Sequence, residues 1–194
     1  MSDMVRFSLI SLLLLGLAAC GAAPPAQGDK QKAPAPQGAA AKVVRGKADY
    51  SKAGQKLPPL VYESRDGTRH TLGADPKGRI TLINLWATWC APCKAEMPAL
   101  ARLATENAER LSVLAISQDI GGWKLVDRFY SDMKLTGLEP LLDPEAIMSM
   151  QLGAPGLPLT IALDGQGREM WRVSGDRHWD DAESHALIFG TAKP

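Results

Sequence analysis

The chain has 194 residues, 45% of them hydrophobic, which is enough for one domain with a buried core and some additional sequence. Lysine and arginine total 22 against 21 aspartates and glutamates, so charge gives no reason to expect a nucleic acid or an acidic ligand. Three cysteines are too few for a disulfide-rich scaffold, and their odd number needs an explanation.

The first element in chain order is a short apolar segment. Arg6 precedes the apolar residues 7–19, and this stretch is shorter than the about 20 residues that a membrane span needs. Residues 1–19 are therefore predicted to be a secretory signal peptide. The segment ends in Leu-Ala-Ala-Cys at positions 17–20, which is similar to the lipobox of bacterial lipoproteins and implies that Cys20 is acylated. An ordinary signal peptide, or an anchor helix that ends at a cysteine, is the alternative.

Residues 20–45 follow the signal and are rich in alanine, proline, glutamine and glycine. This composition favours a disordered, partly extended tether, and the folded domain is predicted to occupy residues 46–194. The lipid would hold the domain on the periplasmic face of a bacterial membrane. Gly21 stands where an aspartate is often associated with retention at the inner membrane, so either the inner or the outer membrane is expected.

The rest of the chain alternates strand and helix patterns. Asp66-Gly67 lies between two short β-leaning runs and predicts a hairpin over residues 60–72. The other predicted elements are strands at 80–86, 111–117, 159–163 and 169–173, and helices at 91–107, 123–133 and 180–189. This order indicates an α/β fold, in which a mixed central β-sheet has helices on both faces and an N-terminal β-hairpin extension.

The main chemical motif is Trp-Cys-Ala-Pro-Cys at positions 89–93, where the strand at 80–86 gives way to a helix. Residues three apart on a helical turn face the same way, so the sulfurs of Cys90 and Cys93 can form a small disulfide. Cys90 would lie at the helix N-terminus, where free N–H groups and the helix dipole stabilise a thiolate. Pro92 suits the first turn, where a missing N–H costs little.

Two other uses of this cysteine pair are less well supported. A zinc site commonly takes two such pairs, and the chain has no second pair once Cys20 is assigned to the signal. A purely structural disulfide across four residues would constrain little of the chain. The motif therefore indicates redox chemistry, and no metal or cofactor is expected.

Two sequence blocks carry a resemblance to a known family. Residues 84–93, Asn-Leu-Trp-Ala-Thr-Trp-Cys-Ala-Pro-Cys, followed by Glu96 and Pro98, resemble the TlpA/ResA-like branch of the thioredoxin superfamily. Residues 156–167 resemble the cis-proline loop, strand and turn of the same branch. The resemblance covers roughly residues 57–190. It implies a thioredoxin fold and a thiol–disulfide oxidoreductase.

The resemblance also implies roles for single residues. Pro158 would follow a cis peptide bond, and the backbone of Leu157 would then face the sulfurs and hold an extended substrate peptide. Glu96, one helical turn after Cys93, would be a buried acid that exchanges a proton with that cysteine. The expected substrate-binding residues are Trp89, Ala91, Pro92 and Leu157.

Two departures from the family are visible. Leu157 stands where many relatives have valine or threonine. Asn84 stands where ordinary thioredoxin has a buried aspartate, which puts the usual thioredoxin proton route in doubt.

The expected reaction begins with attack of the Cys90 thiolate on a disulfide of a substrate protein, and Cys93 resolves the mixed disulfide. A membrane thiol–disulfide electron donor would reduce the pair again, and the protein is expected to be a monomer. The resemblance favours a reductase, as in cytochrome c maturation.

Three other functions are alternatives to a reductase. One is a general disulfide oxidase or isomerase. The second is a copper-binding chaperone that recruits His178 or His185 to the sulfurs. The third is a thiol peroxidase, which is less favoured because Ala87 stands where those enzymes usually have threonine.

Overall fold

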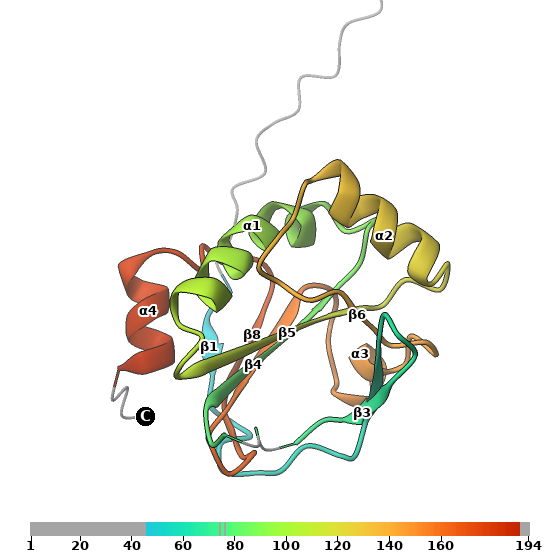
Figure 1. Ribbon diagram of the computed structural model, residues 1–194. Coiled ribbons are helices and arrows are strands. Elements are labelled where there is room, and N and C mark those ends of the chain that lie inside the picture. The colour runs from blue at the N-terminus through green and yellow to red at the C-terminus, as the bar shows by residue number, and fades with distance from the viewer. Residues whose placement is uncertain (1–45, 74, 76, 191–194) are drawn as a thin grey trace, which may run out of the picture. The chain divides into compact units, whose positions relative to one another are not determined.

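A computed structural model describes residues 46–73, 75 and 77–190 of the chain (Figure 1). The predicted signal peptide, Cys20 and the tether all lie in residues 1–45, outside the described part. None of the described helices combines the length and the apolarity that a membrane crossing requires.

The described strands form one mixed sheet in the order β1-β8-β7-β4-β5-β6-β2-β3. Neighbouring β4, β5 and β6 run parallel, whereas the other neighbouring pairs are antiparallel. The strands are β1 (Ala48–Asp49), β2 (Val61–Ser64), β3 (Arg69–Thr71), β4 (Ile80–Trp86), β5 (Leu111–Ser117), β6 (Leu141–Leu142), β7 (Leu159–Leu163) and β8 (Glu169–Ser174).

Helices cover both faces of this sheet, but unequally. The apolar side chains of α1 (Ala91–Glu106), α2 (Trp123–Asp132) and α4 (Ala182–Phe189) join one buried cluster. The one-turn helix α3 (Met148–Gln151) and the residues flanking the β2–β3 hairpin join a second cluster on the other face. Because side chains alternate along a strand, Leu82 and Trp86 of β4 face the first cluster and Ile83 and Leu85 face the second.

The predicted fold class and the N-terminal hairpin are confirmed, with strand limits that differ by about one residue. Sequence analysis did not predict β1, β6 or α3. Two-residue strands and a single helical turn are too short to produce a recognisable hydrophobic period.

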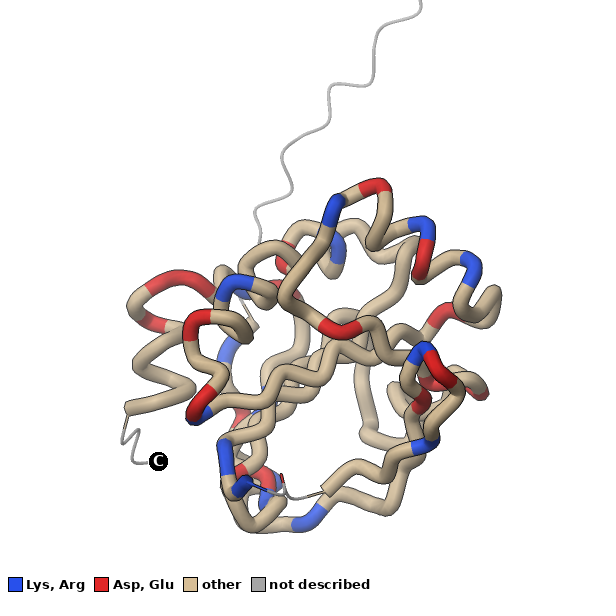
Figure 2. The backbone as a smooth tube through the Cα atoms, in the orientation of Figure 1, with Lys and Arg blue, Asp and Glu red and all other residues tan. Residues whose placement is uncertain are grey.

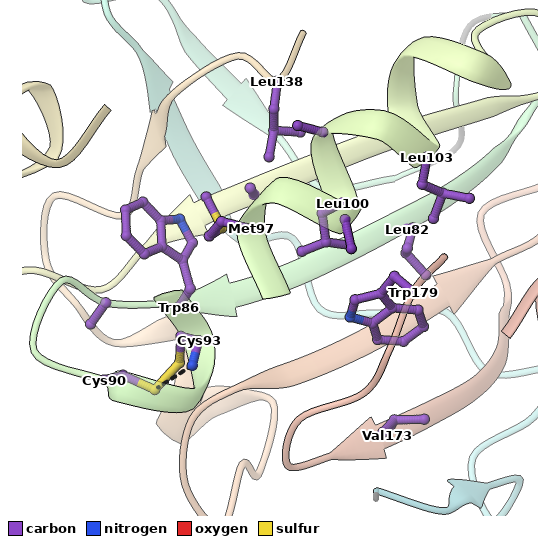
Figure 3. Close-up of a cluster of buried hydrophobic side chains, with 14 of the residues drawn as sticks. Leu82, Trp86, Cys90, Cys93, Met97, Leu100, Leu103, Leu138, Val173 and Trp179 are labelled. Atoms are coloured by element: carbon purple, nitrogen blue, oxygen red, sulfur yellow. Dashed lines mark hydrogen bonds between the residues drawn. A yellow bond between two sulfur atoms is a disulfide. The ribbon is translucent and has the colours of Figure 1, made fainter. Parts of the chain in front are cut away.

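The first buried cluster reaches the cysteine motif. Figure 3 shows Cys93 below Trp86, with Met97, Leu100 and Leu103 farther along α1. The Trp86 ring also lies 4.8 Å from the ring of Phe129 in α2, measured between centroids. The disulfide segment is therefore backed by a packed core, which limits how far α1 can move relative to β4.

Charged residues of both signs are interspersed over the described part of the chain (Figure 2). In α2, for example, Lys124 and Arg128 alternate with Asp127 and Asp132. The described surface therefore has the mixed charge that the overall composition suggests.

Candidate active site

The sheet register brings two distant segments to one edge. Leu85 near the end of β4 is paired with Leu159 at the start of the antiparallel β7. Cys90 follows β4 after a short turn, and Pro158 immediately precedes β7. The cysteine motif and the proline loop therefore meet at this edge of the sheet, although they are far apart in the sequence.

Cys90 and Cys93 form a disulfide with their Cα atoms 5.3 Å apart. Cys90 is the N-cap of α1, and its sulfur accepts a hydrogen bond of 3.3 Å from the backbone N–H of Cys93. Cys90 is 5% exposed, whereas Cys93 is fully buried. Of the two cysteines only Cys90 thus has exposed surface, and it lies where the helix N-terminus favours a negative charge.

Asp119 holds the turn that leads into the motif. Its carboxylate accepts hydrogen bonds from the backbone N–H of Thr88 at 2.9 Å and from the Thr88 hydroxyl at 2.7 Å. The Ser117 hydroxyl donates to the same carboxylate at 2.8 Å. These hydrogen bonds fix the turn next to Trp89, which is 69% exposed.

The sequence patterns did not single out Asp119. The available signal was an acidic residue two positions after the end of β5, at the sheet edge where the β4 turn also lies.

Glu96 is buried below the disulfide, with 4% of its surface exposed. Its Oε2 accepts hydrogen bonds from the Trp179 indole at 3.0 Å and from the backbone N–H of Arg177 at 3.3 Å. Burial raises the pKa of Glu96 to about 7, and the nearby charge of Asp176 adds to this rise. The hydrogen bonds oppose it, because they stabilise the ionised form.

Asn84 supplies the remaining contact to this carboxyl. Its side-chain amide donates to Glu96 Oε1 at 2.7 Å and to the Thr160 hydroxyl at 3.0 Å. The side-chain oxygen of Asn84, Oδ1, is buried and has no hydrogen-bond partner among the described residues. Trp179 is both buried and a donor to the acid.

The peptide bond between Leu157 and Pro158 is cis. Beside this loop lies a groove of about 510 Å³, lined mostly by apolar and small side chains together with Gln118 and Asp119. The lining includes Trp89 and Leu157, but among the described residues it does not include Ala91 or Pro92. Those two are exposed on the first turn of α1. The structure thus brings two of the four predicted substrate-binding residues to the groove and places the other two outside it.

The groove rim carries further apolar residues that sequence analysis did not select. Ile120 is 91% exposed and Leu125 is 39% exposed, and both line the groove. Exposed apolar surface gathered beside a reactive group indicates a contact surface for a partner.

The two histidines named for a copper site lie in different surroundings. His178 lines a small recess with Glu96 and Pro92, and the His185 ring lies 5.9 Å from the Phe189 ring. Within the described residues, no group of three or more His, Cys, Asp or Glu side chains is placed to hold a metal ion.

Comparisons with known proteins agree with this geometry. A family model described as Redoxin matches residues 52–187. The thiol:disulfide interchange protein HelX of Rhodobacter capsulatus is 31% identical over 147 residues, which cover 72% of this chain and 79% of HelX. The thioredoxin-like protein YneN of Bacillus subtilis is 34% identical over 116 residues, which cover 59% of this chain and 66% of YneN.

Solved structures show the same fold. A structure described as a putative thiol:disulfide interchange protein DsbE from Chlorobium tepidum has a TM-score of 0.56 at 22% identity, covering 70% of this chain and 92% of that chain. The exposed lipoprotein thioredoxin Etrx1 of Streptococcus pneumoniae has a TM-score of 0.56 at 21% identity, covering 67% of this chain and 98% of that chain.

Proposed function

The chain belongs to the Redoxin family and is a thioredoxin-like thiol–disulfide oxidoreductase, and on this premise we propose that it reduces disulfides of partner proteins outside the cytoplasm. The observation that carries the proposal is the Cys90–Cys93 disulfide at the N-terminus of α1. Cys90 keeps a small exposed fraction, Cys93 is fully buried, and the sheet register places the cis-proline loop at the same edge.

In the first step, the Cys90 thiolate of the reduced protein attacks one sulfur of the partner's disulfide. The partner's S–S bond breaks, a mixed disulfide with Cys90 forms, and the other partner sulfur leaves as a thiolate that takes a proton from solvent. The helix N-terminus favours the attacking thiolate, because unpaired N–H groups there stabilise negative charge.

In the second step, Cys93 loses its proton and attacks the Cys90 sulfur. The Cys90–Cys93 bond forms, the mixed disulfide breaks, and the second partner sulfur leaves. Two electrons have then passed from the cysteine pair to the partner. Glu96 is the proposed acceptor of the Cys93 proton, because it lies one turn farther along α1 and its pKa of about 7 suits exchange at neutral pH.

The substrate segment would lie in the groove between Trp89 and the cis-proline loop. The backbone of Leu157 would pair with a peptide as an added strand does, while the apolar rim receives side chains next to the substrate cysteine. Ala91 and Pro92 follow Cys90 and are exposed on the first turn of α1, and they are proposed as secondary contacts.

The compartment and the partners belong to the same proposal. An acylated Cys20 would hold the domain on the periplasmic face of the inner or outer membrane, where a membrane thiol–disulfide donor reduces the oxidised pair. The sequence resemblance supports apocytochrome c or its assembly proteins as substrates. The match to interchange proteins such as HelX supports a disulfide-bonded protein as the partner.

A trapping experiment tests the proposal. The Cys93→Ala variant of the full chain, expressed in a bacterium with an oxidising periplasm, should accumulate a covalent complex that disappears on treatment with dithiothreitol. The Cys90→Ala variant is the matched control and should accumulate none. If neither variant forms reducible complexes, or if both form them equally, Cys90 is not the attacking residue and the proposed function is wrong.

A further inference from the structure

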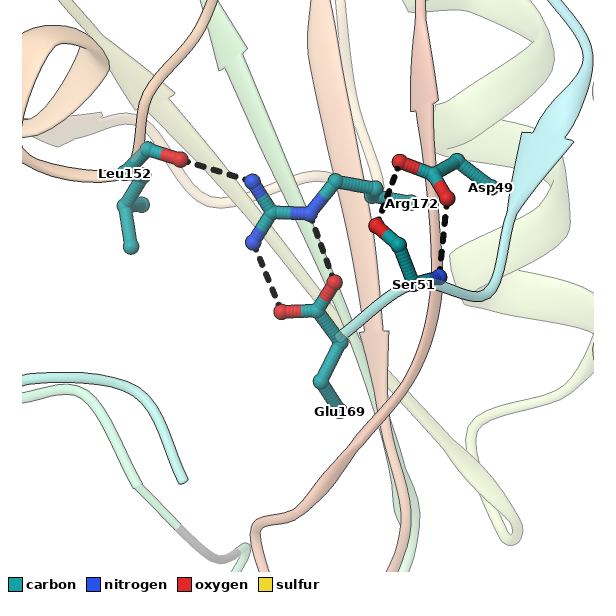
Figure 4. Close-up of polar contacts among 5 residues, drawn as sticks. All are labelled: Asp49, Ser51, Leu152, Glu169 and Arg172. Carbon is teal, nitrogen blue, oxygen red and sulfur yellow. Dashed lines mark hydrogen bonds and ion pairs between the residues drawn. The ribbon is translucent and has the colours of Figure 1, made fainter. Parts of the chain in front are cut away.

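A buried ion pair lies on β8, on the face of the sheet opposite α1 (Figure 4). The side chains of Arg172 and Glu169 are 8% and 1% exposed. Arg172 Nε donates to Glu169 Oε1 at 2.6 Å, and Nη2 donates to Oε2 at 2.7 Å. This is the two-point geometry that makes Arg–carboxylate pairs both strong and directional.

An irregularity in β8 puts these residues on one face. Side chains three apart in a regular strand point to opposite faces. Here Glu169 is paired with Leu163 and Trp171 with Ala162, so Met170 is an extra residue in β8. The bulge brings Glu169 to the face that Arg172 occupies, while Trp171 packs into the other cluster.

The third guanidinium nitrogen of Arg172 contacts a different part of the fold. Its Nη1 donates to the backbone carbonyl of Leu152 at 2.7 Å. Leu152 directly follows α3, and from it the chain runs through residues 153–158, here named the cis-proline loop, into β7. Ala154, Pro155, Gly156 and Leu157 of this loop line the groove beside Trp89.

The end of the cis-proline loop is also fixed by this part of the chain. The Pro158 carbonyl accepts a hydrogen bond of 2.9 Å from the N–H of Gly175, the residue after β8. Arg172 holds the beginning of the loop, and Gly175 holds its end. Between these two points lies Leu157, whose backbone is proposed to meet the substrate.

The pair itself is firmly placed. The Glu169 backbone N–H donates to the Gln55 carbonyl at 2.8 Å, and its carbonyl accepts from Gly54 at 2.7 Å. Asp49, paired with Arg172 in the neighbouring β1, adds a second negative charge. The hydrogen bonds from Ser51 lower the pKa of Asp49 most, and the Arg172 charge lowers it further. The guanidinium therefore has two anions beside it, and the one backbone carbonyl to which it donates within the described part of the chain is that of Leu152.

We propose that Arg172 and Glu169 are positioning residues for the cis-proline loop and set where Leu157 stands relative to the Cys90 sulfur. This inference rests on the proposed function, because it takes the groove as the substrate site. Loss of the pair moves the loop and misaligns polypeptide substrates. A small disulfide that needs only the Cys90 thiolate reacts as before.

The test compares two substrates of the reduced, full-length protein. One is a synthetic peptide with an internal Cys-x-x-Cys disulfide, and the other is the small aromatic disulfide dithiobis(nitrobenzoate). In the double variant Glu169→Met with Arg172→Met, apolar residues of similar volume replace the pair, a change that buried ion pairs often tolerate. Its second-order rate constant should fall about tenfold or more with the peptide and stay unchanged with the small disulfide.

Arg79→Met is a matched control. Arg79 likewise donates to a carboxylate, that of Asp75, and to a backbone carbonyl, that of Ala108, but it lies before β4 at the opposite end of that strand from Cys90. Both rate constants should equal those of the wild type. Arg172→Lys keeps the charge but not the two-point contact, and its peptide rate should fall between those of the wild type and the double variant.

The outcomes separate the inference from the proposed function. A wild-type peptide rate in the folded double variant, or an equal fall with both substrates, overturns the positioning role. If the double variant does not fold, an unchanged peptide rate in Arg172→Lys overturns it. A wild-type protein that reacts with the small disulfide but with no peptide disulfide contradicts the proposed function itself.

Discussion

The Asn84 amide donates a hydrogen bond of 2.7 Å to Glu96 Oε1, joining the centre of β4 to the second turn of α1 below the disulfide. Both residues are buried. An amide N–H stabilises the ionised carboxyl, whereas burial destabilises it, and burial is the larger effect because the pKa of Glu96 rises to about 7. Asn84 therefore limits this rise and does not itself carry a charge.

Removal of this donor should raise the Glu96 pKa further. In Asn84→Leu, the titration midpoint of the Glu96 carboxyl is expected to move to higher pH, because one of the bonds that favour the charged form is lost. Carbon-13 NMR of the labelled Glu96 carboxyl in the oxidised protein measures this titration midpoint. Thr160→Val, which removes only the other partner of the amide, is the control and should move the midpoint less. A midpoint in Asn84→Leu equal to or below that of the wild type contradicts this role.

Glu96 should also make folding stability depend on pH. Its pKa is about 7 in the folded protein against an ordinary value of 4.5, so the folded state binds the proton more tightly than the unfolded state. The stabilisation is complete below pH 4.5 and is lost as pH rises through 7. Each pKa unit corresponds to about 1.36 kcal/mol, so the loss is on the order of 3 kcal/mol.

Denaturant unfolding of oxidised wild-type and Glu96→Gln proteins measures this contribution. Between pH 4.5 and 8, the wild type should lose about 3 kcal/mol of unfolding free energy relative to the variant. Carboxyls with a lowered pKa, such as Asp66 and Asp75, act in the opposite direction at acid pH, but both proteins contain them and their effects cancel. Parallel pH curves for the two proteins would refute a buried, titrating Glu96.

The parts of the site that sequence analysis predicted are the local ones. The cysteine motif and the hairpin turn each depend on a few consecutive residues, and helix and turn geometry fix their arrangement. The strand at 80–86 is recognisable because it is long and apolar. The family resemblance added Glu96 and Pro158, which spacing alone does not single out.

The parts that were missed depend on sheet order and on long-range contacts. Trp179 reaches Glu96 across 83 positions, and Thr88 reaches Asp119 across 31. The Arg172–Glu169 pair is close in sequence, but its common face requires the bulge in β8, and a regular strand pattern predicts opposite faces. No local pattern in the sequence specifies these contacts.

Glu96→Gln should slow the resolving step at neutral pH. Glutamine cannot accept the Cys93 proton, so release of a peptide from the Cys90 mixed disulfide should fall about 100-fold, the lower end of what general acid–base catalysis contributes. Stopped-flow kinetics with a fluorescent disulfide peptide measures this step. As the pH rises into the range in which the Cys93 thiol ionises without a base, the two rates should converge. A constant ratio at every pH would assign Glu96 a structural role only.

Cys20 should carry lipid in the mature protein. The small residues before it and the short apolar segment predict cleavage at this position, and one acyl chain alone would give only marginal binding, so more than one is expected. Intact-mass measurement of protein extracted from membranes tests this, with Cys20→Ser as the control that should remain unprocessed. A mature chain with a free Cys20 thiol would rule out the anchor.

Reduction of the disulfide should reveal unequal thiols. Cys90 caps α1 and is 5% exposed, whereas Cys93 is fully buried in the cluster that also contains Met97 and Trp86. The thiolate is the species that alkylates, and the helix N-terminus favours it at Cys90. Brief treatment of the reduced protein with iodoacetamide at pH 7, followed by peptide mass mapping, should modify Cys90 well before Cys93. Cys93→Ala should keep the fast reaction and Cys90→Ala should lose it. Equal labelling of both cysteines, or faster labelling of Cys93, would reverse the assignment of attacking and resolving sulfur and with it the order of steps proposed for this enzyme.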